Sequence, residues 1–168
     1  MSDVLFICTA NICRSAYAEL RSPSIAPQYS YGSAGIQGWN GHKMDSTMAA
    51  ELKNRGGDPT GFKSRRVQAP MVKDAMLVLT ATAGHRTAIL DDSPAARSKV
   101  FSLGQLAQVI ETAPEELRGQ ELIQWVADLR QQSDPRLDVW DPYRKGPEAA
   151  VEAADIIDAH LAVILPRL

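Results

Sequence analysis

The sequence predicts one α/β domain of three layers, in which helices cover both faces of a central parallel sheet of about four strands. Short, continuously apolar segments rich in strand formers recur along the chain, as is typical of strands buried on both faces. Segments with helical spacing of apolar residues separate them, which indicates βαβ units. The length of 168 residues suits a single domain over residues 1–168, with a core that needs no disulfide or metal.

The first half of the chain is expected to supply two strands and two helices. Val4–Ile7 is apolar throughout and predicts a buried strand. After a polar turn, residues 16–20 read as the start of a helix. A second strand is expected at Tyr29–Ser33, close to two glycines that end it. Met44–Lys53 is expected to be helical because Asn54 and the glycines after it supply a stop.

The second half is expected to add two strands and three helices. Residues 75–79 are continuously apolar and predict a strand, and a short helix at 84–90 precedes a strand at 99–101. Two longer helices are expected at Pro114–Arg130 and Pro147–Leu165, each with an apolar stripe that we interpret as core packing. On the last helix, we expect Glu152, Asp155 and Asp158 to face water.

Composition argues against several classes of protein. The net charge is −2 with scattered basic residues, which is not the pattern of a nucleic-acid-binding protein. No run of 18 apolar residues predicts a membrane span, and the first residues lack the pattern of a secretory signal. Two cysteines do not make a disulfide framework, so a reducing cytoplasm is expected. The three histidines show no ligand spacing, so neither a metal nor a cofactor is expected.

Residues 8–15, Cys-Thr-Ala-Asn-Ile-Cys-Arg-Ser, form the segment with the clearest chemical signal. They lie between a predicted strand and a predicted helix, where parallel sheets bind ligands. Amides at such a turn favour an anion and can lower the pKa of a nearby thiol. The Arg14 guanidinium can bind two phosphoryl oxygens at once. Cys8 is then a candidate nucleophile, and the hydroxyl of Ser15 a candidate donor to its sulfur.

This segment resembles the signature loop of the low-molecular-weight protein tyrosine phosphatases, Cys-x-Gly-Asn-x-Cys-Arg-Ser-Pro. The match covers Cys8, Asn11 and the run Cys13–Ser15, and Ala18-Glu19 continues it. Further along, residues 33–35 (Ser-Ala-Gly) and 141–143 (Asp-Pro-Tyr) look like two more motifs of the family. The resemblance extends from Val4 to the last helix.

The resemblance implies a two-step phosphatase reaction. Cys8 would attack phosphorus, Arg14 would stabilise the equatorial oxygens, and Asp141 would serve as acid and then as base. Without the resemblance, Asp58 and Asp134 are equal candidates because each also precedes a proline. The implied partners are a phosphorylated protein and inorganic phosphate, as product and inhibitor. The implied substrate- and phosphate-binding residues are Thr9, Ala10, Asn11, Ile12, Cys13, Ser15, Trp39 and Tyr143.

Three positions in or beside the loop raise separate questions. Ala10 stands where the family has glycine, and would be strained if that position had a positive φ. Ala16 replaces the proline that starts the family's helix. The family also suggests that oxidised Cys8 condenses with Cys13 to a disulfide, which would prevent irreversible over-oxidation.

The resemblance leaves more than one substrate open. Ile12 stands where the arginine phosphatases place threonine, and an apolar side chain there favours protein phosphotyrosine. However, residues 80–85 (Thr-Ala-Thr-Ala-Gly-His) resemble a stretch of the bacterial arginine-type branch, which keeps phosphoarginine as an alternative. A single-cysteine arsenate reductase and a non-catalytic phosphate-binding module are further alternatives on the same fold. A plain α/β domain with cysteines in its core is the least favoured interpretation.

Overall fold

The computed structural model describes residues 2–129 and 131–168, and within them it shows one sheet of four strands. The strand order is β2-β1-β3-β4, and every pairing is parallel. The strands are β1 Val4–Cys8, β2 Tyr31–Gly35, β3 Leu77–Thr80 and β4 Val100–Ser102. The predicted parallel sheet is therefore confirmed.

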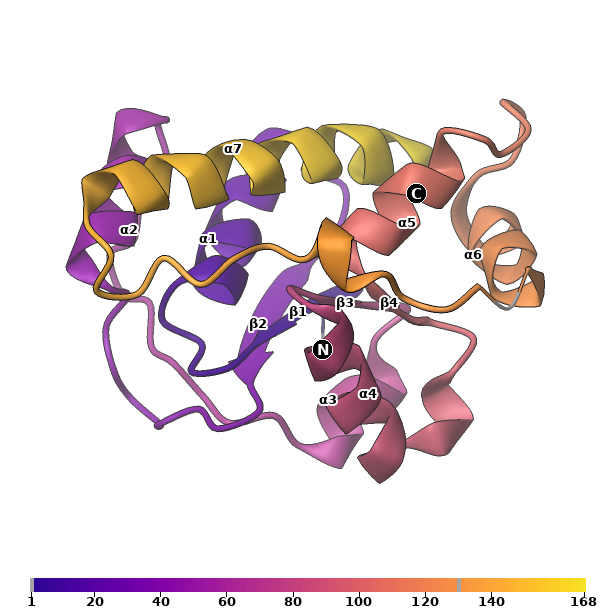
Figure 1. Cartoon of the computed structure of the whole chain (residues 1–168), viewed down its shortest axis with the longest axis horizontal. Coiled ribbons are helices and arrows are strands. Elements are labelled where there is room, and N and C mark those ends of the chain that lie inside the picture. Colours follow the sequence, from indigo (N-terminus) through magenta and orange to yellow (C-terminus); the bar gives the residue numbers. More distant parts are fainter. Residues whose placement is uncertain (1, 130) are drawn as a thin grey trace.

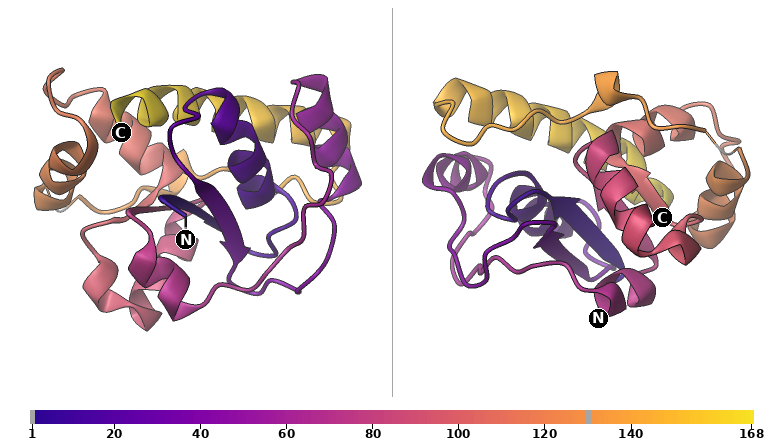
Figure 2. Two further views of the ribbon diagram at one scale, coloured as in Figure 1. Left: turned by 180° about the vertical axis from the view of Figure 1, so that it is seen from behind. Right: turned by 60° about the horizontal axis from the view of Figure 1, so that its bottom comes forward.

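Helices cover both faces of this sheet (Figure 1). The core on one face takes in side chains of α1 (Arg14–Arg21), α2 (Ser46–Asn54), α5 (Leu103–Ile110), α6 (Gly119–Asp128) and α7 (Pro147–Ile164). The other face packs against α3 (Ala69–Asp74) and α4 (Ala83–Asp92), and Figure 2 shows the same layers from two further directions. The predicted three-layer α/β class is confirmed.

The alternation of side chains along β1 explains why the sequence needs helices on both faces. Val4, Phe6 and Cys8 belong to the core under α1 and α7, whereas Leu5 and Ile7 belong to the core under α3 and α4. Successive side chains of a strand point to opposite faces, and all five residues of β1 are buried. A continuously apolar strand is the expected result.

Two helices were not predicted, and one was predicted too long. α3 lies at the end of a stretch whose pattern is hard to interpret, and α5 follows β4 directly with no polar turn between them. All of α5 except Gln108 is buried, so it lacks the exposed stripe that marks a surface helix. The helix predicted at Pro114–Arg130 is observed only as α6, and Arg130 itself lies outside the described residues.

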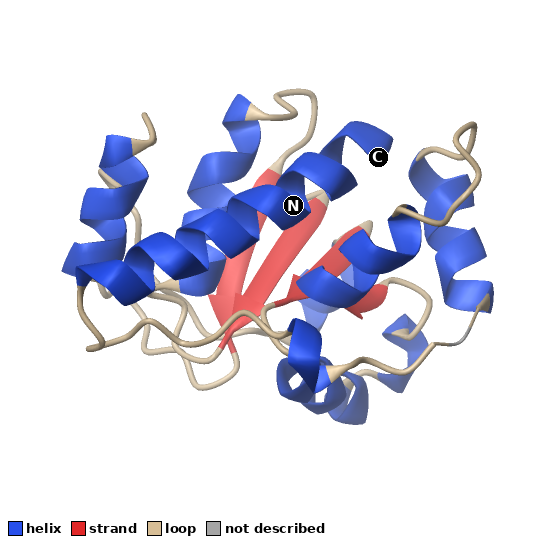
Figure 3. Cartoon of the chain, turned by 45° about the horizontal axis from the view of Figure 1, so that its top comes forward, coloured by secondary structure: helices blue, strands red, loops and turns tan. Residues whose placement is uncertain are grey.

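Because the strands are parallel, their carboxyl ends meet at one edge of the sheet. In Figure 3 the strand arrows point toward an end of the molecule where loops gather. The loop after β2 contacts the end of β1 and its loop, because Ile36 and Gln37 donate backbone hydrogen bonds to Cys8 and Thr9. The segment before α7 reaches the loop after β3, where Val139 donates a backbone hydrogen bond to Ala81. This is the edge at which α/β proteins bind ligands.

Candidate active site

The loop between β1 and α1 lines a pocket and has backbone N–H groups without a hydrogen-bond partner among the described residues. Asn11 adopts a left-handed conformation with φ of 60°, which reverses the chain between strand and helix. Gly35 of β2 lies against this loop, and a Cβ there would stand 2.6 Å from the carbonyl oxygen of Thr9. The backbone N–H groups of residues 10–13 donate to no acceptor in the described part of the chain. Unpaired amides beside a helix N-terminus suit an anion.

The buried Asn11 side chain holds the loop in this shape. Its amide nitrogen donates to Ser15 Oγ at 2.9 Å and to Ser33 Oγ at 2.6 Å. Its amide oxygen accepts a hydrogen bond from the backbone N–H of Arg65 at 2.9 Å. Asn11 is fully buried and does not line the pocket. Its side chain therefore joins three segments behind the loop, and phosphate binding by Asn11, which would have to use its backbone N–H, stays a prediction.

Cys8 ends β1 with its sulfur beside a hydroxyl. The distance from Cys8 Sγ to Ser15 Oγ is 2.9 Å. Because Ser15 Oγ already accepts from Asn11, its own O–H is available to donate to the sulfur. Ser15 itself does not line the pocket, so its hydroxyl meets the sulfur from behind the cavity.

Arg14 begins α1, and its side chain is 5% exposed. Its Nη1 donates to the carbonyl oxygen of Val139 at 2.9 Å, and Nη2 lies 3.4 Å from both Thr9 Oγ1 and the Asp141 carboxylate. The buried Nε has no partner among the described residues. Within the described chain, Nε and the second N–H of Nη1 are therefore free to donate beside the unpaired amides of the loop.

Of the three aspartates that precede a proline, the structure brings Asp141 to the loop. Its side chain is 47% exposed and lines the same pocket as Cys8 and Arg14. Asp134 forms a surface pair with Arg136, and Asp58 accepts hydrogen bonds within its own exposed turn. The convergence of residues 8, 14 and 141 supports Asp141 as the candidate general acid. The resemblance pointed to this residue, whereas the local sequence left three candidates.

The pocket has a volume of about 270 Å³ and carries aromatic residues on its walls. Trp39 and Tyr143, which were expected to bind substrate, both line it, and Trp39 is 64% exposed. Gln37 joins them, although no sequence motif marks this residue. The lining residues are Cys8, Thr9, Ala10, Ile12, Cys13, Arg14, Gln37, Trp39, Asp141 and Tyr143.

His85 is a second residue that sequence reasoning did not place at the loop. Its Nε2 lies 2.9 Å from Thr9 Oγ1, the same hydroxyl that Arg14 approaches. Burial, together with the positive charge of Arg14, lowers the pKa of His85 to about 4, so the imidazole is neutral near pH 7. Its position in the first turn of α4, 76 residues from Thr9, left no local pattern to find.

Comparison with known proteins decides the family. The family model described as low molecular weight phosphotyrosine protein phosphatase matches residues 3–119. The chain belongs to this family of phosphatases. Over its full length it is 26% identical to a probable low molecular weight protein-tyrosine-phosphatase, EpsP of Ralstonia nicotianae, and covers 97% of that protein.

Solved structures share the fold. Wzb of Vibrio vulnificus, in complex with benzylphosphonate, superimposes with a TM-score of 0.77 at 25% identity, with 98% of this chain and 97% of that chain covered. The YwlE arginine phosphatase of Geobacillus stearothermophilus gives a TM-score of 0.71 at 23% identity, with 96% and 91% covered. The second likeness shows the fold alone.

Ala10 departs from the family's glycine without backbone strain. Among the described non-glycine residues, positive φ angles occur at Asn11 and Arg144, not at Ala10. The strain considered for this position is therefore absent, because the left-handed residue is the next one along. Ala16, which replaces the family's proline, is fully buried in the first turn of α1.

Cys13, the second cysteine of the family motif, is a buried free thiol like Cys8. Burial raises the pKa of the Cys13 thiol, and the negative charge of Asp45 adds to the effect. Cys13 therefore remains protonated at neutral pH, and its condensation with oxidised Cys8 stays a prediction.

The described residues contain no group of three or more His, Cys, Asp or Glu side chains placed to hold a metal ion. Within the same residues, no helix combines the length and the apolarity that crossing a membrane requires.

Proposed function

We propose that this phosphatase hydrolyses protein phosphotyrosine through a phosphocysteine intermediate. The observation that carries the proposal is the meeting of Cys8, Arg14 and Asp141 in one pocket, from segments more than a hundred residues apart. A nucleophile, a planar cation and a carboxylate around one cavity are the groups that phosphoryl transfer to sulfur requires.

In the first step, Cys8 sulfur bonds to phosphorus as the bond from phosphorus to the phenolic oxygen breaks. Asp141 gives its proton to that oxygen, and tyrosine leaves neutral. In the second step, a water oxygen attacks phosphorus, the sulfur–phosphorus bond breaks, and Asp141 takes the water proton. The loop amides and Arg14 donate to the equatorial oxygens in both steps.

The preference for an aryl phosphate rests on the pocket walls. Ile12, Trp39 and Tyr143 offer apolar and aromatic surface to a phenyl ring. The benzylphosphonate complex of Vibrio vulnificus Wzb supports a ligand that joins an aromatic ring to a phosphonate. For phosphoarginine, the threonine-rich stretch gives no added support: Thr80 and Thr82 are engaged in hydrogen bonds at the start of α4 and do not line the pocket.

Matched aspartate variants test the chemistry. Asp141→Asn should lower kcat about 10²–10⁴-fold on a phosphotyrosine peptide, and less on p-nitrophenyl phosphate, whose leaving group needs little protonation. Asp134→Asn is the control, because that residue also precedes a proline but pairs with Arg136 at the surface. Cys8→Ser should abolish turnover of both substrates. An equal loss in the two aspartate variants, or turnover that survives Cys8→Ser, would contradict the mechanism.

A panel of substrates tests the preference. We expect phosphotyrosine peptides to be hydrolysed well above the rates for phosphoserine and phosphoarginine peptides, with competitive inhibition by inorganic phosphate. Comparable rates on phosphoserine would mean that a short substrate reaches Cys8, which contradicts the aryl-lined pocket. Faster turnover of phosphoarginine would favour that alternative.

A further inference from the structure

A second hollow, of about 230 Å³, adjoins the catalytic pocket. Asp141 lines both, so the two cavities are neighbours on either side of one residue. The second hollow lies between the segment that carries Asp141 and the first half of α7. Its lining residues are Trp140, Asp141, Pro142, Lys145, Ala149, Glu152, Ala153 and Ile156.

The hollow is apolar along one helix face and polar at its rim. Ala149, Ala153 and Ile156 recur at a spacing of four and three residues, so they lie on the same side of α7. Lys145 and Glu152 are exposed and carry opposite charges, and Asp141 adds a second carboxylate at the edge that the hollow shares with the catalytic pocket. An apolar floor inside a charged rim suits an uncharged, bulky side chain.

Trp140 is the most unusual residue of this hollow. It directly precedes Asp141 and is 69% exposed. Among the described residues, the large hydrophobic side chains that are exposed are Trp39, Leu129, Trp140, Tyr143 and Val151. Three of these, the aromatic ones, line one or other of the two hollows. Exposed aromatic side chains gathered around an active site indicate a surface that a partner covers.

We propose that this hollow, the Trp140 subsite, binds a bulky apolar side chain of the protein substrate while the phosphorylated ring occupies the catalytic pocket. The assignment rests on the proposed function. Each hollow is smaller than the roughly 300–1,000 Å³ of a typical small-molecule site, so one extended ligand that fills both is the better fit. An extended peptide places alternate side chains on one face about 7 Å apart, which suits neighbouring pockets.

The experiment compares phosphotyrosine peptides that differ at one position. Phenylalanine or glycine is placed two residues before or two residues after the phosphotyrosine, and kcat/KM is measured for each peptide with the full chain. At one of the two positions, we expect the phenylalanine peptide to exceed the glycine peptide about tenfold. Trp140→Ala should bring that ratio close to one, and so should Ala149→Phe, which fills the hollow. Val151→Ala is the control, since that exposed residue of α7 does not line the hollow.

Each outcome decides a separate question. A ratio near one for the wild-type enzyme at both positions overturns the subsite, as does a ratio that survives both variants. Sedimentation that finds a dimer dissociated by Trp140→Ala would assign the hollow to a second copy of this chain, which also overturns the proposal. Wild-type turnover of p-nitrophenyl phosphate distinguishes failure of the subsite from failure of the proposed function. If the wild-type enzyme hydrolyses this substrate while the peptide ratio is near one, the subsite fails and the proposed function stands.

Discussion

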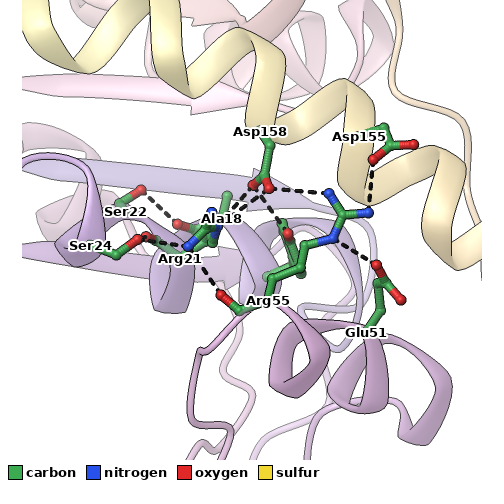
Figure 4. Close-up of polar contacts among 9 residues, drawn as sticks. Ala18, Arg21, Ser22, Ser24, Glu51, Arg55, Asp155 and Asp158 are labelled. Atoms are coloured by element: carbon green, nitrogen blue, oxygen red, sulfur yellow. Dashed lines mark hydrogen bonds and ion pairs between the residues drawn. The ribbon is translucent and has the colours of Figure 1, made fainter.

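Two arginines of this protein are largely buried, yet their surroundings are opposite. Arg55, at the end of α2, has all three of its nitrogens bound to carboxylates: Glu51 at 2.6 Å, Asp155 at 2.8 Å and Asp158 at 3.2 Å (Figure 4). Arg14 in the pocket has one short hydrogen bond, to a backbone carbonyl, and an unpartnered Nε among the described residues. Arg55, which joins helices, has a partner for every nitrogen, whereas Arg14, which lines the pocket, keeps N–H groups without a partner among the described residues.

Asp158 shows how the saturated site forms. It accepts from Arg21 Nε at 3.2 Å and from the Tyr17 hydroxyl at 3.1 Å as well as from Arg55, so α7 is joined to both α1 and α2. The expectation that Asp158 faces water was wrong, because the basic residues it meets lie on two other helices. Burial raises the pKa of Tyr17, and the nearby Asp158 charge adds to this, so the phenol stays neutral and donates.

The largest expected effect is on kcat, when each of these two arginines is replaced by lysine. Arg14→Lys keeps the positive charge but loses the planar fork, so we expect kcat on p-nitrophenyl phosphate to fall about 10²–10³-fold. Arg55→Lys is the matched control and should leave kcat close to the wild-type value. Steady-state kinetics on both variants checks this. A comparable loss in Arg55→Lys would show that the ion-pair cluster also governs the chemistry.

The sequence was informative where chemistry or burial is local. The apolar run of β1 and the spacing of Cys8, Arg14 and Ser15 are contiguous features, so the strand and the loop were predictable. The helix after them was expected from residue 16 and begins two residues earlier, at Arg14. Asp141 was reached only through the resemblance, because its selection over Asp58 and Asp134 depends on a contact across more than a hundred residues. Gln37, His85 and the backbone N–H of Arg65 reach the loop or its supports from distant elements, and no local pattern marks them.

A second comparison concerns stability. Arg55→Met removes the cation from three carboxylates, two of which are mostly buried, so we expect a loss of about 2 kcal/mol in the free energy of unfolding. Arg136→Met is the control, because its pair with Asp134 is formed by an arginine that is 89% exposed, and its stability should match the wild type. Urea denaturation measures both. Equal midpoints for the two variants would contradict the structural role given to Arg55.

His85, which lies beside the loop, should make the free energy of unfolding depend on pH. Its pKa is about 4 in the folded protein and near 6.5 when unfolded, so the unfolded chain binds more protons between these values. Stability is therefore fully present above pH 6.5 and falls as the pH drops toward 4, by up to about 3 kcal/mol for this group. His85→Gln removes the titration while keeping a polar group near Thr9. Urea denaturation across this range should give a shallower decline for the variant, and parallel curves would rule out the assignment.

The smallest expected effect on activity is that of a substitution at Ala10, which we compare with the same substitution at its neighbour Asn11. Because Asn11 carries the positive φ, glycine at position 10 relieves no strain, and Ala10→Gly should leave kcat/KM within about twofold of wild type. Asn11→Gly keeps the backbone conformation accessible but removes the hydrogen bonds to Ser15, Ser33 and Arg65, so its activity should fall well below that of Ala10→Gly. Kinetics on p-nitrophenyl phosphate distinguishes the two. If glycine at position 10 raised activity severalfold, the loop would be strained at that residue after all, and the geometry assigned to the phosphate-binding turn would need revision.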